Sequence, residues 1–448
     1  MSAIKVVKMQ SGMQDKAKVF AVDYEGRGVA RVGGKAVFIR GALPGEEVRF
    51  RVTQSKKSFD EAEVVDIYQA SPDRVEPICR HFGVCGGCVL QHASAKAQVA
   101  YKQRVMEEQL LRIGKVQPEK ILPPIYGNPW TYRHRARLSV TKNKQGRTKL
   151  GFRSRRSNEV VDLEECAVLP QEIVEVLPYL RLLLDSLSDK AVVEYIEFSV
   201  GQLLTALNIC TRSCLSEKDL DKLKMFSDRH LKNKQYAWQI WLQTKPNQTQ
   251  PFYPQNMPEL FYEMPEFNVK MPFQPGDFTQ INQELNTLMV ARAVRMLEPK
   301  KGEKIVDLFC GLGNFTLPIA KSGAHVLGIE GESRLVQRAK MNAKINGCAD
   351  NTHFETADLF AVTQADIKKW GKPDKILLDP PRSGAYEIVK ALGTACMPKR
   401  IVYVSCNPAT FARDANVIVE KGYKFKEVGV MNMFPQTAHI ESIGLFYR

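Results

Sequence analysis

The feature that most restricts the fold is an alternation of short apolar runs and helical patterns from residue 278 to the end of the chain. Four apolar runs stand out, at 304–309, 325–330, 375–380 and 400–405. This alternation predicts a mainly parallel sheet with helices on both faces. A doubly wound sheet of this kind binds ligands at the carboxyl ends of its strands. Polar residues that follow the apolar runs are therefore the first candidates for a site.

A glycine turn follows the first run. Residues 304–317 read K-I-V-D-L-F-C-G-L-G-N-F-T-L, which predicts a strand, a turn and the start of a helix. Glycines let the backbone approach a nucleotide-like ligand, but the third glycine of the dinucleotide fingerprint is absent. Glu330 ends the next run, where a carboxylate can accept hydrogen bonds from both hydroxyls of a ribose. NAD enzymes use the same device, so these two features leave a dehydrogenase open.

Two further acidic residues argue against a dehydrogenase. Asp358 follows a third predicted strand, where a carboxylate can read an adenine amino group, and Asp379 ends a fourth in Asp-Pro-Pro. A single acid in such a place is often only a helix cap. Acids at several successive strand ends indicate a ligand site at this edge of the sheet.

Cys406 follows the last apolar run directly, in R-I-V-Y-V-S-C-N-P. A lone cysteine there is most often a packing residue, but at the rim of a ligand site a thiolate is also a nucleophile. A reaction that begins with thiolate addition needs a base to finish it. The segment F-P-Q-T-A-H-I-E, 434–441, offers His439 and Glu441, and their spacing does not decide between them.

The ten cysteines of a chain without an export signal are candidates for metal ligation or catalysis rather than disulfides. Cys79, Cys85 and Cys88 form a C-x5-C-x2-C run in one glycine-containing loop. A distant fourth ligand is Cys166, although two other residues compete for that role, Cys210 and Cys214. Three ligands from one wrapped loop favour a [4Fe-4S] cluster, while zinc and buried free thiols remain alternatives.

The net charge of +15 indicates a polyanionic partner, with nucleic acid as the first candidate. Between residues 19 and 67, short apolar runs separated by glycine turns predict a small antiparallel barrel of five strands, of the oligonucleotide-binding kind. A second basic region, 132–156, contains ten Lys or Arg and no acid. There Arg133, Arg135 and Arg137 alternate, so a strand would present them to phosphates on one face, with Tyr132, His134 and Phe152 as stacking partners for bases.

These patterns divide the chain into an RNA-binding barrel, 1–70, a central α+β domain with the cysteine cluster, 71–277, and a C-terminal α/β domain, 278–448. An amphipathic helix is expected at 94–114, packed on the C-terminal domain. Its N-cap is Ser94, it ends at Gly114, and its apolar face carries Val99, Met106, Leu110 and Ile113. No stretch reaches the length of a membrane helix, so we expect a cytoplasmic, monomeric protein without a membrane partner.

Five motifs together resemble the RNA uracil-5-methyltransferase family: F-T-Q-I-N (278–282), D-L-F-C-G-L-G-N-F (307–315), L-D-P-P-R (378–382), S-C-N-P (405–408) and F-P-Q-T-A-H-I-E (434–441). The resemblance implies a Rossmann-like methyltransferase domain, with Cys406 as nucleophile and Glu441 as base. The N-terminal barrel is similar to a TRAM domain. Barrel and cysteine cluster together favour the branch of the family that methylates 23S ribosomal RNA.

The resemblance also implies two cofactors. A [4Fe-4S] cluster is expected on Cys79, Cys85, Cys88 and Cys166. S-adenosyl-L-methionine is expected to contact Gln280, Phe309, Gly311, Asn314, Glu330, Asp358 and Asp379.

Other readings remain to be tested. An amino-methyltransferase would carry an aromatic residue where this chain has Arg382, and an RNA cytosine-5-methyltransferase would carry a Pro-Cys pair that is absent. The same chemistry on transfer RNA or another ribosomal uridine is an alternative. So is a non-enzymatic iron-sulfur protein that binds RNA.

Overall fold

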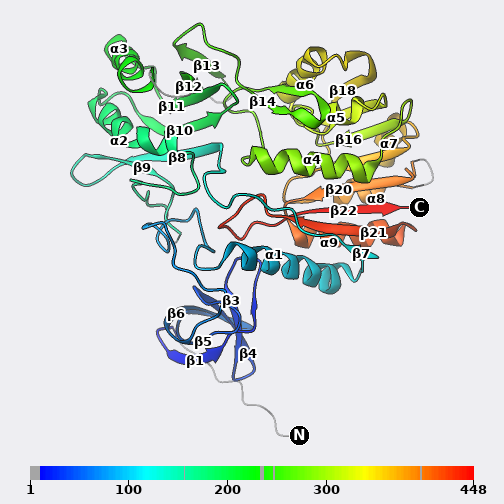
Figure 1. Cartoon of the computed structure of the whole chain (residues 1–448), viewed down its shortest axis with the longest axis horizontal. Helices are drawn as coiled ribbons and strands as arrows, with labels where there is room; N and C mark the ends of the chain where they lie inside the picture. The colour runs from blue at the N-terminus through cyan, green and yellow to red at the C-terminus, as the bar shows by residue number, and fades with distance from the viewer. Residues whose placement is uncertain (1–10, 156, 233–236, 246–247, 394–395) are drawn as a thin grey trace.

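The computed structural model describes residues 11–155, 157–232, 237–245, 248–393 and 396–448. Residues 1–10 of the predicted barrel and Arg156 of the basic region lie outside these ranges. The chain forms three main sheets, which follow one another along the sequence from the small N-terminal sheet to the large C-terminal one (Figure 1). A long loop that contains Cys79, Cys85 and Cys88 connects the first sheet to the rest.

The N-terminal sheet has six strands in the order β1-β5-β6-β4-β3-β2. Its strands are β1 (Gln14–Lys18), β2 (Ala21–Val22), β3 (Gly28–Val32), β4 (Lys35–Arg40), β5 (Glu47–Ser55) and β6 (Phe59–Gln69). Alternate side chains such as Val37, Ile39, Val48 and Phe50 fill its core. The expectation of five antiparallel strands is wrong in two respects, because β2 is a separate short strand and β4 pairs with β6 in parallel.

The central sheet also has six strands, in the order β13-β12-β11-β10-β8-β9. Its elements are β8 (Arg135–Lys142), β9 (Thr148–Gly151), α2 (Gln171–Ser186), β10 (Val193–Val200), β11 (Leu204–Thr211), α3 (Glu217–Phe226), β12 (Ala237–Lys245) and β13 (Gln248–Tyr253). The apolar face of α2, including Ile173, Leu177 and Leu180, packs into the same core as Leu138 and Phe198 of the sheet. A hairpin of β14 (Phe261–Met264) and β15 (Val269–Pro272) follows.

The C-terminal sheet has eight strands in the order β18-β17-β16-β19-β20-β22-β21-β7. The first five run parallel, as predicted, and β22 and β21 add an antiparallel hairpin beside β20. The strands are β16 (Lys304–Leu308), β17 (His325–Glu330), β18 (Thr352–Thr356), β19 (Lys375–Leu378), β20 (Arg400–Ser405), β21 (Lys424–Met431) and β22 (Glu441–Tyr447).

Helices cover both faces of this sheet (Figure 1). Leu285 and Leu335 belong to the core on one face, and Ile388 and Phe411 to the core on the other. The helices are α4 (Gln283–Leu297), α5 (Thr316–Ala320), α6 (Ser333–Ile345), α7 (Gln364–Lys369), α8 (Tyr386–Ala391) and α9 (Pro408–Glu420). None of the helices in the described ranges is both long enough and apolar enough to cross a bilayer.

Residues 95–125 lie against the C-terminal sheet although they precede the central one. Helix α1 (Ala95–Gln109), which begins at the N-cap Ser94, packs on α9 and β21. The two-residue strand β7 (Lys120–Ile121) pairs with β21 at the edge of the sheet. The helix ends in a π-helical turn, Leu110–Gly114. Because this turn changes the helical phase, Ile113 is exposed and not on the buried face as predicted, whereas Met106 and Leu110 are buried.

Candidate active site

The carboxyl ends of β16, β17, β18 and β19 bring five of the predicted donor-binding residues to one edge of the sheet, namely Phe309, Gly311, Glu330, Asp358 and Asp379. Phe309 follows β16 with a φ of 64°, an unusual backbone conformation for a residue other than glycine. Its ring lies 5.7 Å from that of Phe360, which is exposed. Asp358 accepts a hydrogen bond of 2.9 Å from the Phe360 backbone N–H. The edge thus combines an aromatic pair with a carboxylate, a combination that suits a purine nucleoside.

Glu330 is held at the end of β17 by backbone donors. Its carboxylate accepts hydrogen bonds from the N–H groups of Gly311, at 3.0 Å, and Gly331, at 2.7 Å. The φ of Gly311 is 56°, in the left-handed region that favours glycine. The turn and the carboxylate therefore fix each other, with the carboxylate at the strand end where a ribose would approach.

Asn314 lies behind this turn in a reciprocal amide pair with Asn286 of α4. Its Oδ1 accepts from Asn286 Nδ2 at 3.0 Å and from the Tyr262 hydroxyl at 2.8 Å, and its Nδ2 donates to Asn286 Oδ1 at 2.9 Å. One hydrogen of the Asn314 amide is not used by this pair. Gln280 lies two residues before Asn282, the N-cap of α4.

Two carboxyl groups lie beneath the same edge, Asp307, which is buried, and Asp379, which is partly exposed. Burial raises the pKa of Asp379 to about 7, and the charge of Glu330 adds to the increase. Burial likewise raises the pKa of Asp307 to about 7, although the Thr316 hydroxyl, which donates to it at 2.5 Å, opposes the change. A cation bound at this edge would favour the ionised form of Asp379.

Cys406 follows β20 immediately and is only partly exposed. Burial, together with the charges of Glu441 and Asp379, raises the pKa of its thiol to about 12, while the Arg382 charge opposes the increase. These interactions place Cys406, Glu441 and Asp379 within electrostatic reach of one another. The thiol is protonated at neutral pH in the absence of ligands, so a bound substrate must promote its ionisation.

Glu441 is the first residue of β22, which pairs with β20 through Ser442 and Ser405. It is 3% exposed, and burial together with the charge of Asp379 raises its pKa well above the usual range. His439, the other candidate base, has an exposed side chain whose ring nitrogens lie 2.9 and 3.1 Å from Arg382. Although His439 is accessible to solvent at its surface, partial desolvation of its ring by the surrounding chain, together with the Arg382 charge, lowers the pKa of His439 to about 4. Of the two candidates, Glu441 is the one that is buried within electrostatic reach of Cys406, and its role as the base stays a prediction.

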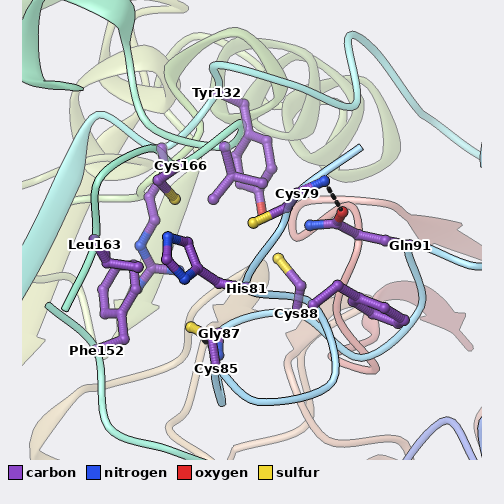
Figure 2. A pocket seen from close by; sticks show the side chains of 13 residues that line it. Cys79, His81, Cys85, Gly87, Cys88, Gln91, Tyr132, Phe152, Leu163 and Cys166 are labelled. Carbon is purple, nitrogen blue, oxygen red and sulfur yellow. Dashed lines mark hydrogen bonds between the residues drawn. The ribbon is translucent and has the colours of Figure 1, made fainter. Parts of the chain in front are cut away.

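The four predicted cluster ligands line a single cavity of about 60 Å³. Figure 2 shows the side chains of Cys79, Cys85, Cys88 and Cys166 around this cavity, with the ring of His81 between them. The competing residues Cys210 and Cys214 are not part of its lining. In the described ranges, no three His, Cys, Asp or Glu side chains form a group that could hold a metal ion.

The surroundings of this cavity fit a group bound by thiolates. His81 Nε2 is buried without a hydrogen-bond partner. Burial raises the pKa of the Cys85 thiol, and this increase is opposed by the Gly87 N–H, which donates to Cys85 Sγ at 3.4 Å, and by the charges of Arg155 and Arg133. Burial raises the pKa of Cys88 to about 12 and that of Cys166 to about 11, so binding of a metal group would release protons.

A family model described as tRNA (Uracil-5-)-methyltransferase matches residues 95–448, which is most of the chain. The chain belongs to this family. The resemblance drawn from the five motifs is confirmed, and the chain is a methyltransferase. A TRAM domain model matches residues 16–65, in the N-terminal sheet.

Relatives in the uracil-5-methyltransferase family match nearly the whole chain. The protein named 23S rRNA (uracil(1939)-C(5))-methyltransferase RlmD of Neisseria lactamica is 53% identical over 431 residues, covering 96% of this chain and 95% of the relative. The protein of the same name from Nitrosospira multiformis is 48% identical and covers 96% of this chain and 97% of the relative. The crystal structure of Pyrococcus abyssi tRNA (uracil-54, C5)-methyltransferase with S-adenosyl-L-homocysteine has the same fold. Its TM-score is 0.74 at 23% identity, covering 96% of this chain and 100% of that chain.

The basic region of this uracil-5-methyltransferase family member is less free for phosphates than its composition predicts. Arg135 and Arg137 form ion pairs of 3.3 and 2.9 Å with Glu197, a buried residue of the neighbouring strand β10. Tyr132 is 5% exposed and, like Phe152, lines the cysteine cavity. The predicted stacking role of Tyr132 is therefore wrong, and phosphate contact by Arg135 and Arg137 stays a prediction.

Two residues of α1 with a structural role near Glu441 were missed in the sequence. Gln98 and Lys102 are 1% and 2% exposed and contact the segment before Glu441. The signal was present, because polar residues four apart on the face of Met106 have to find buried partners.

Proposed function

We propose that this chain transfers a methyl group from S-adenosyl-L-methionine to carbon 5 of one uridine in 23S ribosomal RNA. The observation that carries the proposal is the juxtaposition of Cys406 and Glu441 at the ends of the paired strands β20 and β22, beside Asp379 at the donor edge. Relatives that match 96% of the chain carry the name of a 23S rRNA uracil methyltransferase. Because these relatives match the chain over nearly its whole length, ribosomal RNA is the first substrate to test.

The reaction begins when the Cys406 thiol loses its proton to solvent and the resulting thiolate adds to carbon 6 of the uracil ring. The electrons of the 5,6 double bond shift toward the carbonyl oxygen on carbon 4, which gives an enolate whose carbon 5 can attack the methyl group of the donor. The carbon–sulfur bond of the sulfonium breaks and S-adenosyl-L-homocysteine leaves. Glu441 then takes the proton from carbon 5, the double bond re-forms, and the bond from carbon 6 to the cysteine sulfur breaks.

The donor is proposed to lie along the edge formed by the ends of β16 to β19, with its adenosine near the aromatic pair of Phe309 and Phe360. Its sulfonium charge would favour the ionised form of Asp379. The proposed contacts are Gln280, Phe309, Gly311, Asn314, Glu330, Asp358 and Asp379.

RNA is proposed to bind through the N-terminal sheet and the basic region, with phosphates as the main contacts. A uracil inside a duplex cannot reach Cys406, so the target base must leave its stack. We propose the division at residues 70 and 277 as functional units, with residues 95–125 attached to the methyltransferase unit.

A [4Fe-4S] cluster is proposed at the cysteine cavity, with Cys79, Cys85, Cys88 and Cys166 as its ligands. The proposal is supported by four thiols on one cavity and by the unpaired His81 nitrogen. When bound, the cluster would supply iron–thiolate bonds that tie the loop of Cys79 to Cys88 to the distant segment of Cys166.

The test is a methylation assay with labelled donor on unmodified 23S ribosomal RNA and, in parallel, on unmodified transfer RNA, followed by mapping of the methylated base. We expect 5-methyluridine at one position of the ribosomal RNA. Methylation of transfer RNA alone would contradict the proposal that ribosomal RNA is the substrate. Tight RNA binding without any turnover would favour a non-enzymatic RNA-binding protein.

A further inference from the structure

The segment that connects β21 to Glu441 is stabilised mainly by hydrogen bonds from residues outside the β21–β22 hairpin. We call this segment, Asn432–Ile440, the catalytic loop. Two parts of the chain far away in the sequence contact it, namely the walls of the cysteine cavity and helix α1. The loop therefore adopts a shape that depends on residues more than 300 positions earlier, since the separations are 303 residues for Tyr132 and 330 for Lys102.

Residues from two parts of the chain beside the cysteine cavity contact two successive residues of the catalytic loop. The N–H groups of Val89 and Leu90, the residues after Cys88, donate to the Gln436 carbonyl at 2.8 and 3.0 Å. The Tyr132 hydroxyl donates to the Pro435 carbonyl at 2.7 Å.

Tyr132 is itself tied to the segment that carries the fourth thiol. The N–H groups of Thr131 and Arg133, its two neighbours, donate to the carbonyls of Ala167 and Val168, both at 2.9 Å. Figure 2 shows the Tyr132 side chain between those of Cys166 and Cys79. A change in the position of either cysteine segment is thus transmitted to Pro435 and Gln436 by direct hydrogen bonds.

Helix α1 holds the catalytic loop from the other side. Gln98 and Gln436 form a reciprocal pair, in which Gln98 Nε2 donates to Gln436 Oε1 at 2.9 Å and the Gln436 N–H donates to Gln98 Oε1 at 2.8 Å. Lys102 Nζ donates to Asn432 Oδ1 at 2.7 Å and to the Phe434 carbonyl at 2.9 Å.

Gln436 has a φ of 67°, in the left-handed region that a residue with a side chain rarely adopts. Such a conformation persists only where the surroundings impose it. Here the imposing contacts are those of Gln98, Val89 and Leu90. Loss of these contacts would let the loop relax away from the shape that leads into Glu441.

We infer that Tyr132 and Gln98 are positioning residues for Glu441, and that filling of the cysteine cavity sets the position of this base through the catalytic loop. The inference rests on the proposed role of Glu441 in removing the carbon 5 proton. Cys406 is carried by β20 and by the Asn407 cap of α9, apart from the cavity. A disturbed cavity should therefore slow the release of methylated RNA from Cys406 and leave the formation of the covalent adduct intact.

The test compares Tyr132→Phe with the matched control Tyr101→Phe in the full chain purified without oxygen. Both changes remove one hydroxyl group, but the Tyr101 hydroxyl contacts Asp73, at 3.2 Å, and not the catalytic loop. We expect Tyr132→Phe to keep its iron and sulfide content and its KM for RNA, while kcat falls about tenfold and the methylated adduct accumulates on denaturing gels. The control should behave as the wild type does, and Gln98→Met should behave like Tyr132→Phe.

A second measurement does not depend on turnover. Amide hydrogen exchange at 432–441 should become faster in Tyr132→Phe and in protein stripped of metal by a chelator, with no change in Tyr101→Phe. Unaltered exchange in Tyr132→Phe and in stripped protein would overturn the inference, as would normal release of the adduct by Tyr132→Phe. If the wild type itself methylates no RNA, the proposed function fails, and the exchange experiment still decides whether the cavity holds the loop.

Discussion

In the ligand-free enzyme, Cys406 should react slowly with thiol reagents. Its thiol has a pKa of about 12 because of burial and the nearby Glu441 and Asp379, against 9.0 for an ordinary cysteine. A difference of three pKa units reduces the thiolate fraction about a thousandfold at neutral pH. The remaining thiolate is more nucleophilic, by about 15- to 30-fold for a Brønsted coefficient of 0.4–0.5. The net rate should therefore be about 30- to 60-fold below that of free N-acetylcysteine.

The assay is labelling with a small disulfide reagent, followed by mass spectrometry of the peptide that contains Cys406. Exposed Cys214 reports in the same sample that the reagent is active. Between pH 7 and pH 10 the rate at Cys406 should rise about tenfold per unit. Arg382→Gln should slow the labelling further, because the Arg382 charge favours the thiolate.

A steric barrier would also slow the labelling, so the pH dependence decides. A labelling rate that levels off near pH 7 would show that the thiol is already ionised at rest, and a rate equal to that of N-acetylcysteine would show that its pKa is not raised. The electrostatic description of the site would then be wrong.

Three other predictions follow from the site and the packing. Cys406→Ala should bind RNA and form no adduct, whereas Glu441→Gln should accumulate a methylated covalent complex on denaturing gels; trapping by a His439 variant instead would reassign the base. Protein purified without oxygen should contain about four irons and four sulfides, and stoichiometric zinc without sulfide would contradict the proposed cluster. Glu46→Ala should lower the free energy of unfolding of the N-terminal sheet by about 2–3 kcal/mol in urea denaturation, because buried Glu46 accepts hydrogen bonds of 2.5 and 2.8 Å from Arg74. Hydrogen bonds from Arg74 and the backbone lower the pKa of Glu46 despite burial, so this difference should shrink as the pH falls below the ordinary value of 4.5 and through the lowered pKa.

The places of the proposed reacting residues in the fold were predictable because these residues follow strand ends directly. Cys406 comes after β20 and Asp379 after β19, as the apolar runs predicted, and parallel strands bring such ends together. The choice between His439 and Glu441 was not predictable from spacing. It depends on which side chain is buried beside the thiol, and burial is set by the pairing of β20 with β22.

Partners far apart in the sequence were the hardest to foresee. A region of ten basic residues without an acid indicated a phosphate surface, but the fold supplies Glu197 from a different strand to Arg135 and Arg137. The packing of the helix at 94–114 on the C-terminal domain was expected, but its particular contacts with the catalytic loop were hidden, since neither segment alone indicates the other. Local periodicity cannot report such pairings, because they arise only when distant elements pack.

The packing of α1 against the β21–β22 hairpin has a consequence during protein synthesis. Lys102 and Asn432, which are hydrogen-bonded in the folded enzyme, are 330 residues apart. Strand β7 likewise cannot pair until β21 has been synthesised. At about 5–20 residues per second, a ribosome needs roughly 15–65 s to make the intervening chain. For that time α9 and β21, on which α1 packs, do not yet exist, and a chaperone that holds apolar segments would protect the apolar side of α1. If synthesis stops within the last thirty residues, α1 near the start of the chain lacks its partners, and the end of the chain is incomplete. Such a chaperone should therefore bind at both places.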